Sequence, residues 1–368
     1  MVKGAAALVF LLFCAVLISL NFINIGDFSN RWGFQPSSAH VVSEVPIILG
    51  YNAFFSEKIT EWMRKNSEPT TVCDYECVFT DDRNFGFAKD ASMVLFHGKE
   101  LSPAALPIGK LSDQQIKAFF LLESPVHAGM SRLPNDFFDL IVTYRNDSDV
   151  PMPYDSFQKI DTAMNYMNYT VWDQKEVEDI VSKKSELVLE MVSNCNTDSK
   201  REIYSREMQK HANVSVVGRC GKIQCNRFVD CEANLIRSHC FYLAFENSVC
   251  PEYVTEKFFR MKQLIVPVVL KRSVVEGIAP EGSFVAADDF GSPKELVHFL
   301  QKTARDREAY MKYFEWTKHF YREPTKATTA CELCKIAWKG LKERKKKDAA
   351  RFWDPSSCSR SFAQRLLG

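Results

Sequence analysis

The chain has 368 residues, of which 46% are hydrophobic and 25% are charged, and its formal net charge is +1. This composition is typical of one or two globular domains and excludes a disordered or fibrous protein. Because the charge is balanced, there is no overall attraction for nucleic acid, and any anion-binding site must be local.

The N-terminus is a short basic end followed by a long apolar run. Residues 5–25 approach the length of about 20 apolar residues that a bilayer span requires. Lys3 lies on the short N-terminal side of this run, and no small-residue cleavage site closes it. We therefore predict a cytoplasmic tail at 1–4, a signal-anchor transmembrane helix at 5–25 and a stem at 26–44, with a lumenal body. The alternative, a cleaved signal peptide, gives a soluble product in the same compartment.

The body is rich in cysteine, since eleven of the twelve cysteines lie outside the apolar run. Such usage favours an oxidising compartment and disulfide bonds. Only Cys331 and Cys334 form a C-x-x-C pair, and no second pair at zinc-ligand spacing accompanies them. We therefore expect disulfides rather than metal, with at least one thiol outside the intrachain pairs. In a lumenal protein, three N-x-S/T sequons are candidate glycosylation sites: Asn146, Asn168 and Asn213.

The first part of the body alternates short apolar runs with amphipathic stretches. Four runs rich in β-branched and aromatic residues are expected to form buried strands: 45–51, 92–97, 118–124 and 139–145. Asp81 and Asp82 form an acidic pair between the first two runs. Because no further candidate ligands accompany this pair, we interpret it as a solvated turn. A polar, aromatic connection follows from about 146 to 184.

A second series of strands and helices begins near residue 186. The expected strands are 186–193, 213–218, 240–247 and 265–270. We expect helices over 198–211 and 255–264, and a capping box at Ser292-Pro-Lys-Glu295 opens a long helix through residue 320. This alternation predicts two α/β domains with mostly parallel sheets, at 45–185 and 186–368, facing a cleft in which ligands bind at strand carboxyl ends.

The densest chemical pattern lies in residues 241–270, which should form strand, loop, helix and strand. A helix that begins near Thr255 would present free backbone N–H groups to an anion, and Lys257 in its first turn adds a full positive charge. Glu256 beside it could accept hydrogen bonds from sugar hydroxyls. The same residues also fit an ordinary helix start with a solvated lysine.

Three runs in this region, Phe245-Glu-Asn-Ser248, Tyr253-Val-Thr-Glu-Lys257 and Val266-Pro-Val-Val-Leu270, resemble in order the donor-site signature of the alpha-1,3-fucosyltransferases, glycosyltransferase family 10. Residues 191–204 resemble the family's V-S-N-C segment followed by R-x-x-Y, and Leu122-Glu-Ser-Pro125 resembles its E-S-P element. The resemblance covers nearly the whole body. It implies two Rossmann-like domains of the GT-B type: an acceptor-binding domain at 45–185, and a GDP-fucose-binding domain at 186–368 that ends in a helical tail.

The resemblance also implies a donor-binding set in the second domain. Lys257 and Arg201 would contact the diphosphate of GDP-fucose, and Glu256 would contact donor hydroxyls. The full implied set is Ser193, Asn194, Arg201, Tyr204, Asn247, Tyr253, Glu256 and Lys257. No metal is obligatory for this chemistry, and stimulation by a divalent cation stays open.

In the first domain, the resemblance implies Glu123 as the catalytic base of an inverting transfer of L-fucose from GDP-β-L-fucose to a GlcNAc hydroxyl of a glycoprotein glycan. A glutamate that ends an apolar strand can have its pKa raised by desolvation, toward the value that a base needs near neutral pH. The alternative is a polar residue that merely marks the end of the strand. His127 is a candidate for the acceptor side, although a structural role fits it equally, and His97 has the same two interpretations.

The chain departs from the family pattern at several positions. Glu252 stands where Asp is typical, residues 258–264 lack the family's usual Asn and small residue, and Lys271 replaces a common Gly. A second hypothesis is therefore a catalytically weak or inactive Golgi glycan-binding protein that retains the fold. The resemblance implies a single-pass type II Golgi membrane protein with a lumenal catalytic domain. It leaves open whether the acceptor is the core GlcNAc or a Lewis or LacdiNAc antenna.

Overall fold

The computed structural model describes residues 45–67, 73–83, 90–128, 133–160, 171–225, 230–324, 328–343 and 345–368. These residues belong to one compact unit that runs from residue 44 to the C-terminus. The predicted tail, signal anchor and stem, and the sequon at Asn168, lie outside the described residues. Within the described ranges, no helix has both the length and the apolar character needed to cross a membrane.

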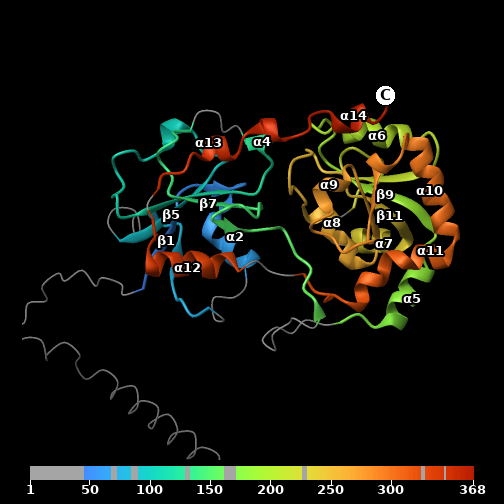
Figure 1. Cartoon of the computed structure of the whole chain (residues 1–368), viewed down its shortest axis with the longest axis horizontal. Coiled ribbons are helices and arrows are strands. Elements are labelled where there is room, and N and C mark those ends of the chain that lie inside the picture. Colours follow the sequence, from blue (N-terminus) through green and yellow to red (C-terminus); the bar gives the residue numbers. More distant parts are fainter. Residues whose placement is uncertain are drawn as a thin grey trace, which may run out of the picture. The chain divides into compact units, whose positions relative to one another are not determined.

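The first half of the unit, residues 45–160, is built on a parallel sheet of six strands in the order β4-β1-β5-β6-β7-β8 (Figure 1). The strands are β1 (Ile47–Gly50), β4 (Val78–Thr80), β5 (Ala91–His97), β6 (Ile116–Leu121), β7 (Leu140–Thr143) and β8 (Val150–Pro151). All four strands predicted here are confirmed. The short edge strands β4 and β8 were not predicted, because two or three residues carry too little periodicity. A small antiparallel hairpin joins β2 (Ala53–Phe54) to β3 (Glu57–Lys58).

The second half, residues 171–324, contains a parallel five-stranded sheet in the order β10-β9-β11-β12-β13. Its strands are β9 (Glu186–Met191), β10 (Val214–Val217), β11 (His239–Leu243), β12 (Val266–Val269) and β13 (Val285–Ala286). The four predicted strands are again confirmed. The chain therefore forms two parallel sheets one after the other, as the sequence predicted.

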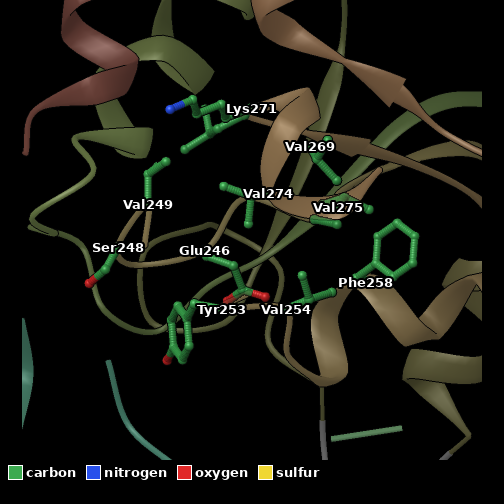
Figure 2. A pocket seen from close by; sticks show the side chains of 12 residues that line it. Glu246, Ser248, Val249, Tyr253, Val254, Phe258, Val269, Lys271, Val274 and Val275 are labelled. Atoms are coloured by element: carbon green, nitrogen blue, oxygen red, sulfur yellow. The ribbon is translucent and has the colours of Figure 1, made fainter. Parts of the chain in front are cut away.

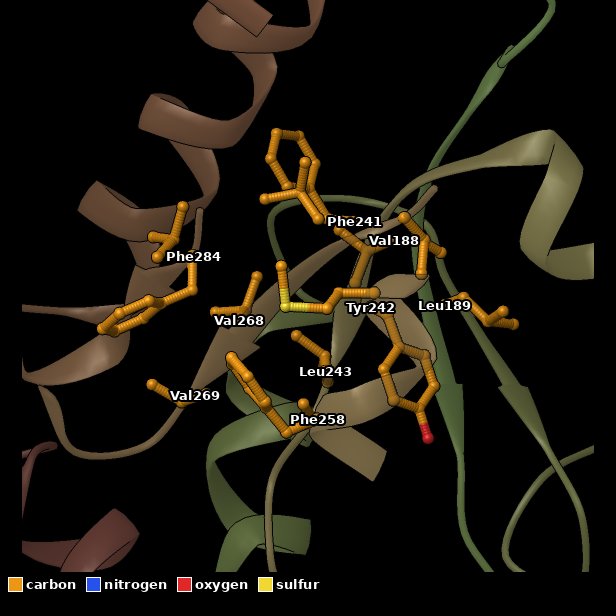
Figure 3. Close-up of a cluster of buried hydrophobic side chains, with 14 of the residues drawn as sticks. Val188, Leu189, Phe241, Tyr242, Leu243, Phe258, Val268, Val269 and Phe284 are labelled. Carbon is orange, nitrogen blue, oxygen red and sulfur yellow. The ribbon is translucent and has the colours of Figure 1, made fainter. Parts of the chain in front are cut away.

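The second sheet is buried on both faces. Residues on either side of β9 and β11, such as Val188 and Leu189 or Phe241 and Tyr242, are at most 1% exposed, and Figure 3 shows them with their neighbours from β12. Parallel strands covered on both faces are apolar along their whole length, because neither side faces water. This property made the central strands easy to locate in the sequence.

Helices cover both sheets, with α7 and α10 against the second sheet and α2 and α12 against the first. The longer ones are α2 (Ile59–Asn66), α5 (Gln174–Ser182), α6 (Arg201–Met208), α7 (Cys231–Ser238), α10 (Pro293–Arg305), α11 (Arg307–Met311) and α12 (Thr329–Lys339). One-turn helices are α4 (Pro125–Ala128), α8 (Glu256–Phe259), α9 (Arg272–Val275), α13 (Ala349–Phe352) and α14 (Phe362–Arg365).

The capping box at the start of α10 is present, since the Ser292 hydroxyl accepts the backbone N–H of Glu295 at 3.2 Å. The predicted single helix through residue 320 is wrong. It is interrupted at Asp306, which has a non-helical backbone and accepts the N–H of Ala309 to start α11. A 3₁₀ helix, Lys312–Lys318, follows. An aspartate can end one helix and cap the next, because its side chain competes for backbone N–H groups.

The C-terminal segment returns to the first half. Helices α12 and α13 and the fully buried Trp353 belong to the hydrophobic core of the first sheet, and α14 packs against α6 of the second half. The predicted division at residue 186 therefore needs correction, because residues 329–353 complete the first domain. The amphipathic pattern of α12 showed that one face is buried, but it could not show which core covers that face.

Five disulfides join ten of the eleven cysteines that lie outside the apolar run, which confirms the predicted disulfide bonds. The pairs are Cys73–Cys331, Cys77–Cys334, Cys195–Cys220, Cys225–Cys231 and Cys250–Cys358. The first two pairs fasten α12 to the first half. Cys240 is a free, buried thiol, as the odd number required.

Of the acidic pair at 81–82, Asp82 is exposed as a solvated turn requires, whereas Asp81 is bound within the fold. The carboxylate of Asp81 accepts the hydroxyl of Thr60 and, at 3.4 Å, its backbone N–H. Asp81 therefore binds the first turn of α2, a contact between segments 21 residues apart that no local pattern announces.

Candidate donor and catalytic site

The donor-site block lies at the carboxyl ends of β11 and β12, where parallel sheets bind ligands. A pocket opens there, and its apolar wall is formed by valines (Figure 2). Its polar lining residues are Glu246, Ser248, Tyr253 and Lys271. Three of these four belong to the block 241–260, but of the eight predicted donor residues only Tyr253 lines this pocket. Its volume of about 20 Å³ is that of a single water molecule, so the predicted donor site stays a prediction.

Glu246 organises this loop, although sequence analysis assigned it no role. Its carboxylate accepts the backbone N–H of Thr255 at 2.8 Å and the Thr255 hydroxyl at 2.7 Å. It also lies 3.1 Å from the amino group of Lys257. Glu246 thus links the end of β11 to the start of α8. The signal was available, because Glu246 stands inside the quoted F-E-N-S run.

Lys257 carries a firmly held positive charge. Its amino group lies 3.1 Å from Glu246 and 3.0 Å from Glu256. Burial lowers the pKa of Lys257, but the two carboxylates outweigh burial and raise the pKa above its ordinary value. Glu256 is exposed at the surface. Partial desolvation of its carboxyl raises the pKa, but the charge of Lys257 and its neighbours outweigh this and lower the pKa below its ordinary value. Both groups are therefore ionised and adjacent.

The helix start at Thr255 differs from the prediction. Helix α8 has four residues and continues as a 3₁₀ turn, Arg260–Gln263, instead of a helix over 255–264. The N–H of Thr255 donates to Glu246, and the N–H of Lys257 donates to the Thr255 hydroxyl at 3.4 Å. Two of the N–H groups expected to be free for an anion are therefore occupied. The predicted attraction for phosphate would therefore rest mainly on the Lys257 side chain.

Arg201 opens α6, and its guanidinium points into the protein. The residue is 3% exposed, and it donates to the carbonyl of Phe245 at 2.6 Å and to that of Asn194 at 3.4 Å. It therefore links the segments that follow β9 and β11. Its guanidinium lies on the buried side of residues 244–255, the loop between β11 and α8 that we call the donor loop. Its Nε has no hydrogen-bond partner within the described chain. Contact with a diphosphate stays a prediction and requires this side chain to become accessible.

The other predicted donor residues near Arg201 differ in how exposed their side chains are. Ser193 and Asn194 are exposed just beyond the carboxyl end of β9, beside the disulfide Cys195–Cys220. Tyr204 is fully buried against the Phe245 ring. Ser193 and Asn194 are thus available to a ligand, whereas Tyr204 supports the donor loop from the core in this structure.

Glu123 lies at a contact between the two halves of the structure. It follows β6 of the first sheet, and its carboxylate accepts the hydroxyl of Tyr253 at 2.8 Å and the side-chain amide of Asn247 at 3.4 Å. Tyr253 and Asn247 both belong to the donor loop of the second half. The structure therefore brings Glu123 into contact with two predicted site residues, Asn247 and Tyr253, that follow it by 124 and 130 positions in the sequence.

The pKa of Glu123 corrects one expectation. Burial is the strongest single influence and raises the pKa. Hydrogen bonds from the Ser124 N–H, the Tyr253 hydroxyl and the Asn247 amide, with the charge of Lys99, together outweigh it, so that the pKa lies below the ordinary 4.5. The predicted upward shift was wrong, because the strand pattern revealed the burial but not the donors from the other half.

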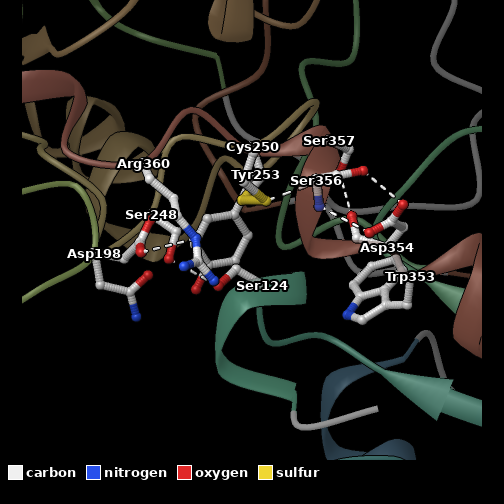
Figure 4. The surroundings of a disulfide bond; sticks show 12 residues. Ser124, Asp198, Ser248, Cys250, Tyr253, Trp353, Asp354, Ser356, Ser357 and Arg360 are labelled. Atoms are coloured by element: carbon white, nitrogen blue, oxygen red, sulfur yellow. Dashed lines mark hydrogen bonds and ion pairs between the residues drawn. A yellow bond between two sulfur atoms is a disulfide. The ribbon is translucent and has the colours of Figure 1, made fainter. Parts of the chain in front are cut away.

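Further contacts hold the halves together around this carboxylate. The Ser124 hydroxyl donates to the Ser248 hydroxyl at 2.9 Å, and Trp353 donates its indole N–H to the Glu123 carbonyl at 3.2 Å. Figure 4 shows Ser124, Ser248 and Trp353 around the disulfide Cys250–Cys358. The disulfide joins the donor loop to the segment that follows α13. A covalent bond therefore links two of the segments near Glu123.

Lys99 is a site residue that sequence analysis missed. Its amino group lies 3.6 Å from the Glu123 carboxylate and 5.0 Å from the ring centre of Phe55. Phe55 is 46% exposed at the tip of the β2–β3 hairpin and has a left-handed backbone conformation, with φ of 46°. Lys99 comes just after β5, so its place beyond a strand carboxyl end was the available signal.

The two histidines are both enclosed. His127 lies in α4, four residues after Glu123, and its buried Nε2 has no partner within the described chain. His97 is fully buried at the end of β5, where its Nδ1 contacts Glu100. Burial lowers the pKa of His97 although Glu100 opposes this. His97 is thus a structural residue, and His127 stays a candidate for the acceptor side.

No group of three or more His, Cys, Asp or Glu residues could hold a metal ion in the part of the chain that the structure describes.

Two predicted glycosylation sites, Asn146 and Asn213, are exposed as modification requires.

The sequence matches two family descriptions: "Fucosyltransferase, N-terminal" over residues 43–155 and "Glycosyltransferase family 10 (fucosyltransferase) C-term" over residues 181–352. It is 32% identical over 324 residues to human 4-galactosyl-N-acetylglucosaminide 3-alpha-L-fucosyltransferase FUT6, covering 85% of this chain and 83% of that protein. It is 31% identical over 278 residues to alpha-(1,3)-fucosyltransferase fut-1 of Caenorhabditis elegans, covering 72% of this chain. That match spans 61% of fut-1, less than two thirds of its length.

The fold is also similar to a solved structure. A crystal structure of an alpha1,3-fucosyltransferase superposes with a TM-score of 0.54 at 15% identity, covering 88% of this chain and 95% of that one. At this identity the similarity concerns the fold alone. The sequence matches confirm the predicted family and enzyme class. The chain therefore belongs to glycosyltransferase family 10, the fucosyltransferases.

Proposed function

We propose that this fucosyltransferase moves L-fucose from GDP-β-L-fucose to the 3-hydroxyl of an N-acetylglucosamine in a glycoprotein glycan, with inversion at the sugar carbon. The relatives support the linkage, because human FUT6 and worm fut-1 are named as 3-alpha- and alpha-(1,3)-fucosyltransferases. A family structure determined with GDP-fucose supports the donor.

The observation that carries this proposal is the meeting of Glu123 with Tyr253 and Asn247. Inverting transfer needs one carboxylate to take the proton of the acceptor hydroxyl, beside a donor held on the opposite wall. The 2.8 Å contact between the Tyr253 hydroxyl and Glu123 places the carboxylate of the first half directly against the donor loop of the second. The lowered pKa keeps this carboxylate ionised and ready to accept a proton.

The donor loop supplies the complementary charge. Negative charge develops on the departing diphosphate, and preorganised cations stabilise it best where they are already held in place. Lys257 is held by Glu246 and Glu256 and stays charged. Arg201 would join it if its guanidinium turns from the Phe245 carbonyl toward the ligand. No step of this scheme requires a metal ion.

The test is transfer from radiolabelled GDP-fucose by the full-length chain in detergent. The acceptor panel contains the core GlcNAc of an N-glycan, Lewis-type antennae and LacdiNAc antennae. We expect transfer to at least one acceptor, with an α-1,3 linkage in the product by NMR. GDP binding by folded protein without transfer to any acceptor would contradict the proposal and favour the glycan-binding alternative.

We further propose that the enzyme resides in the Golgi membrane as a single-pass type II protein. Support comes from the apolar run at residues 5–25 and from five disulfides, which fit an oxidising lumen. Protease protection of the body in sealed Golgi vesicles, with the extreme N-terminus cleaved from outside, is the expected result. Cleavage of the body in sealed vesicles would contradict this orientation.

A further inference from the structure

Lys262 is a buried lysine in the 3₁₀ turn that continues α8. Its side chain is 5% exposed, and its amino group donates to the carboxylate of Asp155 and to the carbonyl of Ser156, both at 2.8 Å. A third contact, at 3.3 Å, reaches the carbonyl of Glu323. A lysine that is almost fully enclosed and has three acceptors is held in one position.

The three acceptors lie on the two segments by which the chain passes between its halves. The first segment, residues 155–160, leaves the first half, and the second, residues 319–324, leaves the second half. The two segments pair with each other: the N–H of Ile160 donates to the carbonyl of His319 at 3.0 Å, and the N–H of Tyr321 donates to that of Gln158 at 3.0 Å. Lys262 therefore binds both members of a paired connection.

The same turn also packs on the connection through aromatic rings. Phe259, one turn earlier, lies 5.8 Å from the ring of Phe157, and the amino group of Lys262 lies 5.2 Å from that ring. The sequence between residues 256 and 262 runs without a break from the donor-site pair Glu256 and Lys257 to Lys262. A displacement of Lys262 is thus transmitted along one short, continuous turn.

The ion pair between Lys262 and Asp155 depends on both partners. Asp155 is 6% exposed on its side chain, so neither charge is stabilised by water. Removing one partner deprives the other buried charge of this ion pair, whereas removing both leaves a neutral contact. The pair is also a departure from the family pattern, because Lys262 stands in the run where the family carries a small residue.

We propose that Lys262 is a positioning residue for fucosyl transfer: by binding both connections, it fixes the turn that presents Glu256 and Lys257 to the nucleotide donor. The proposal rests on the proposed function of the donor site. It assigns a role to a segment, residues 258–264, that departs from the family pattern. Lys262 does not touch the substrate, and it acts through the orientation of α8.

The test compares Lys262→Met, Asp155→Asn and the double variant in the full-length chain, with Lys318→Met as the control. Lys318 also pairs with a carboxylate, that of Glu315, but this pair is exposed and remote in sequence from α8. For Lys262→Met we expect the KM for GDP-fucose to rise about tenfold, with the acceptor KM within about twofold of wild type. The double variant should recover part of this loss, because it removes both charges of the buried pair.

Hydrogen exchange supplies a readout that does not depend on turnover. In Lys262→Met, amides of residues 255–263 and 155–160 should exchange faster, while those of β9 keep their protection. A lower melting temperature with an unchanged KM for GDP-fucose would overturn the proposal and leave a purely structural ion pair. If a single variant does not fold, the neutral double variant decides the same question. Wild-type protein without any transfer would instead contradict the proposed function.

Discussion

At the scale of single residues, the site is controlled by the ionisation of a few buried groups. Glu123 keeps a lowered pKa although it is buried, because donors from both halves stabilise its charge. Glu190, in the strand that leads to the donor site, shows the opposite behaviour. It is buried with one hydroxyl donor, Ser205, and burial raises its pKa to about 7. The number of donors thus decides the direction of each shift.

The lowered pKa of Glu123 predicts the acid limb of the pH–rate profile. We expect kcat/KM to stay level as the pH falls from about 7 to about 5, because the base loses its charge only below its ordinary pKa of 4.5. The check is a profile measured at a temperature well below the melting temperature at every pH of the range. An acid limb centred between about pH 6 and about pH 7 would mean that Glu123 is not the base or has other neighbours in solution.

Glu190 predicts a pH dependence of stability. Its folded pKa of about 7 lies above the ordinary 4.5, so its contribution is fully present below pH 4.5 and is lost as the pH rises through about 7. The charges of Arg201 and Glu202 act on it in opposite directions. Glu190→Gln should therefore remove part of the fall in melting temperature between about pH 5 and about pH 8. Glu186→Gln, at the exposed start of the same strand, is the control and should keep the wild-type dependence.

At the scale of elements, the donor site is a loop held by side chains more than by a helix. Helix α8 has only four residues, and the first N–H groups around it are bound to Glu246 and Thr255. The sequence predicted the strand, the loop and the charge of Lys257, since these depend on local pattern. It could not predict the cap from Glu246, because that contact depends on how β11 and α8 approach each other.

Lys257→Met is expected to weaken GDP binding by roughly 10- to 100-fold, the scale of a lost charge-assisted contact of about 1.5–3 kcal/mol. Calorimetry with GDP measures this directly. Lys318→Met, which removes an exposed lysine from an ion pair with Glu315, is the matched control and should leave the affinity unchanged. Equal GDP affinity in Lys257→Met and wild type would remove Lys257 from the phosphate site.

At the scale of the whole molecule, the site exists only because the chain crosses between two cores. Both sheets and the positions of their central strands along the chain were predictable, because apolar runs of β-branched residues identify buried strands without knowledge of their neighbours. The order of the strands within each sheet was not predicted. The return of residues 329–353 to the first core and the disulfide Cys250–Cys358 were not, since pairings over 100 residues or more leave no local pattern. Glu123 was identified by family resemblance, and its partners Lys99 and Trp353 only by the structure.

The central claim, that Glu123 is the base at the junction of the halves, is tested most directly by Glu123→Gln. Glutamine keeps the size of the side chain and can still accept from Tyr253, but it cannot take a proton. The measurement is the rate of fucosyl transfer together with calorimetric GDP binding, with the exposed Glu281→Gln as a control. We predict a loss in kcat of about 10²-fold or more with GDP affinity largely intact. Unchanged turnover in Glu123→Gln would contradict the account.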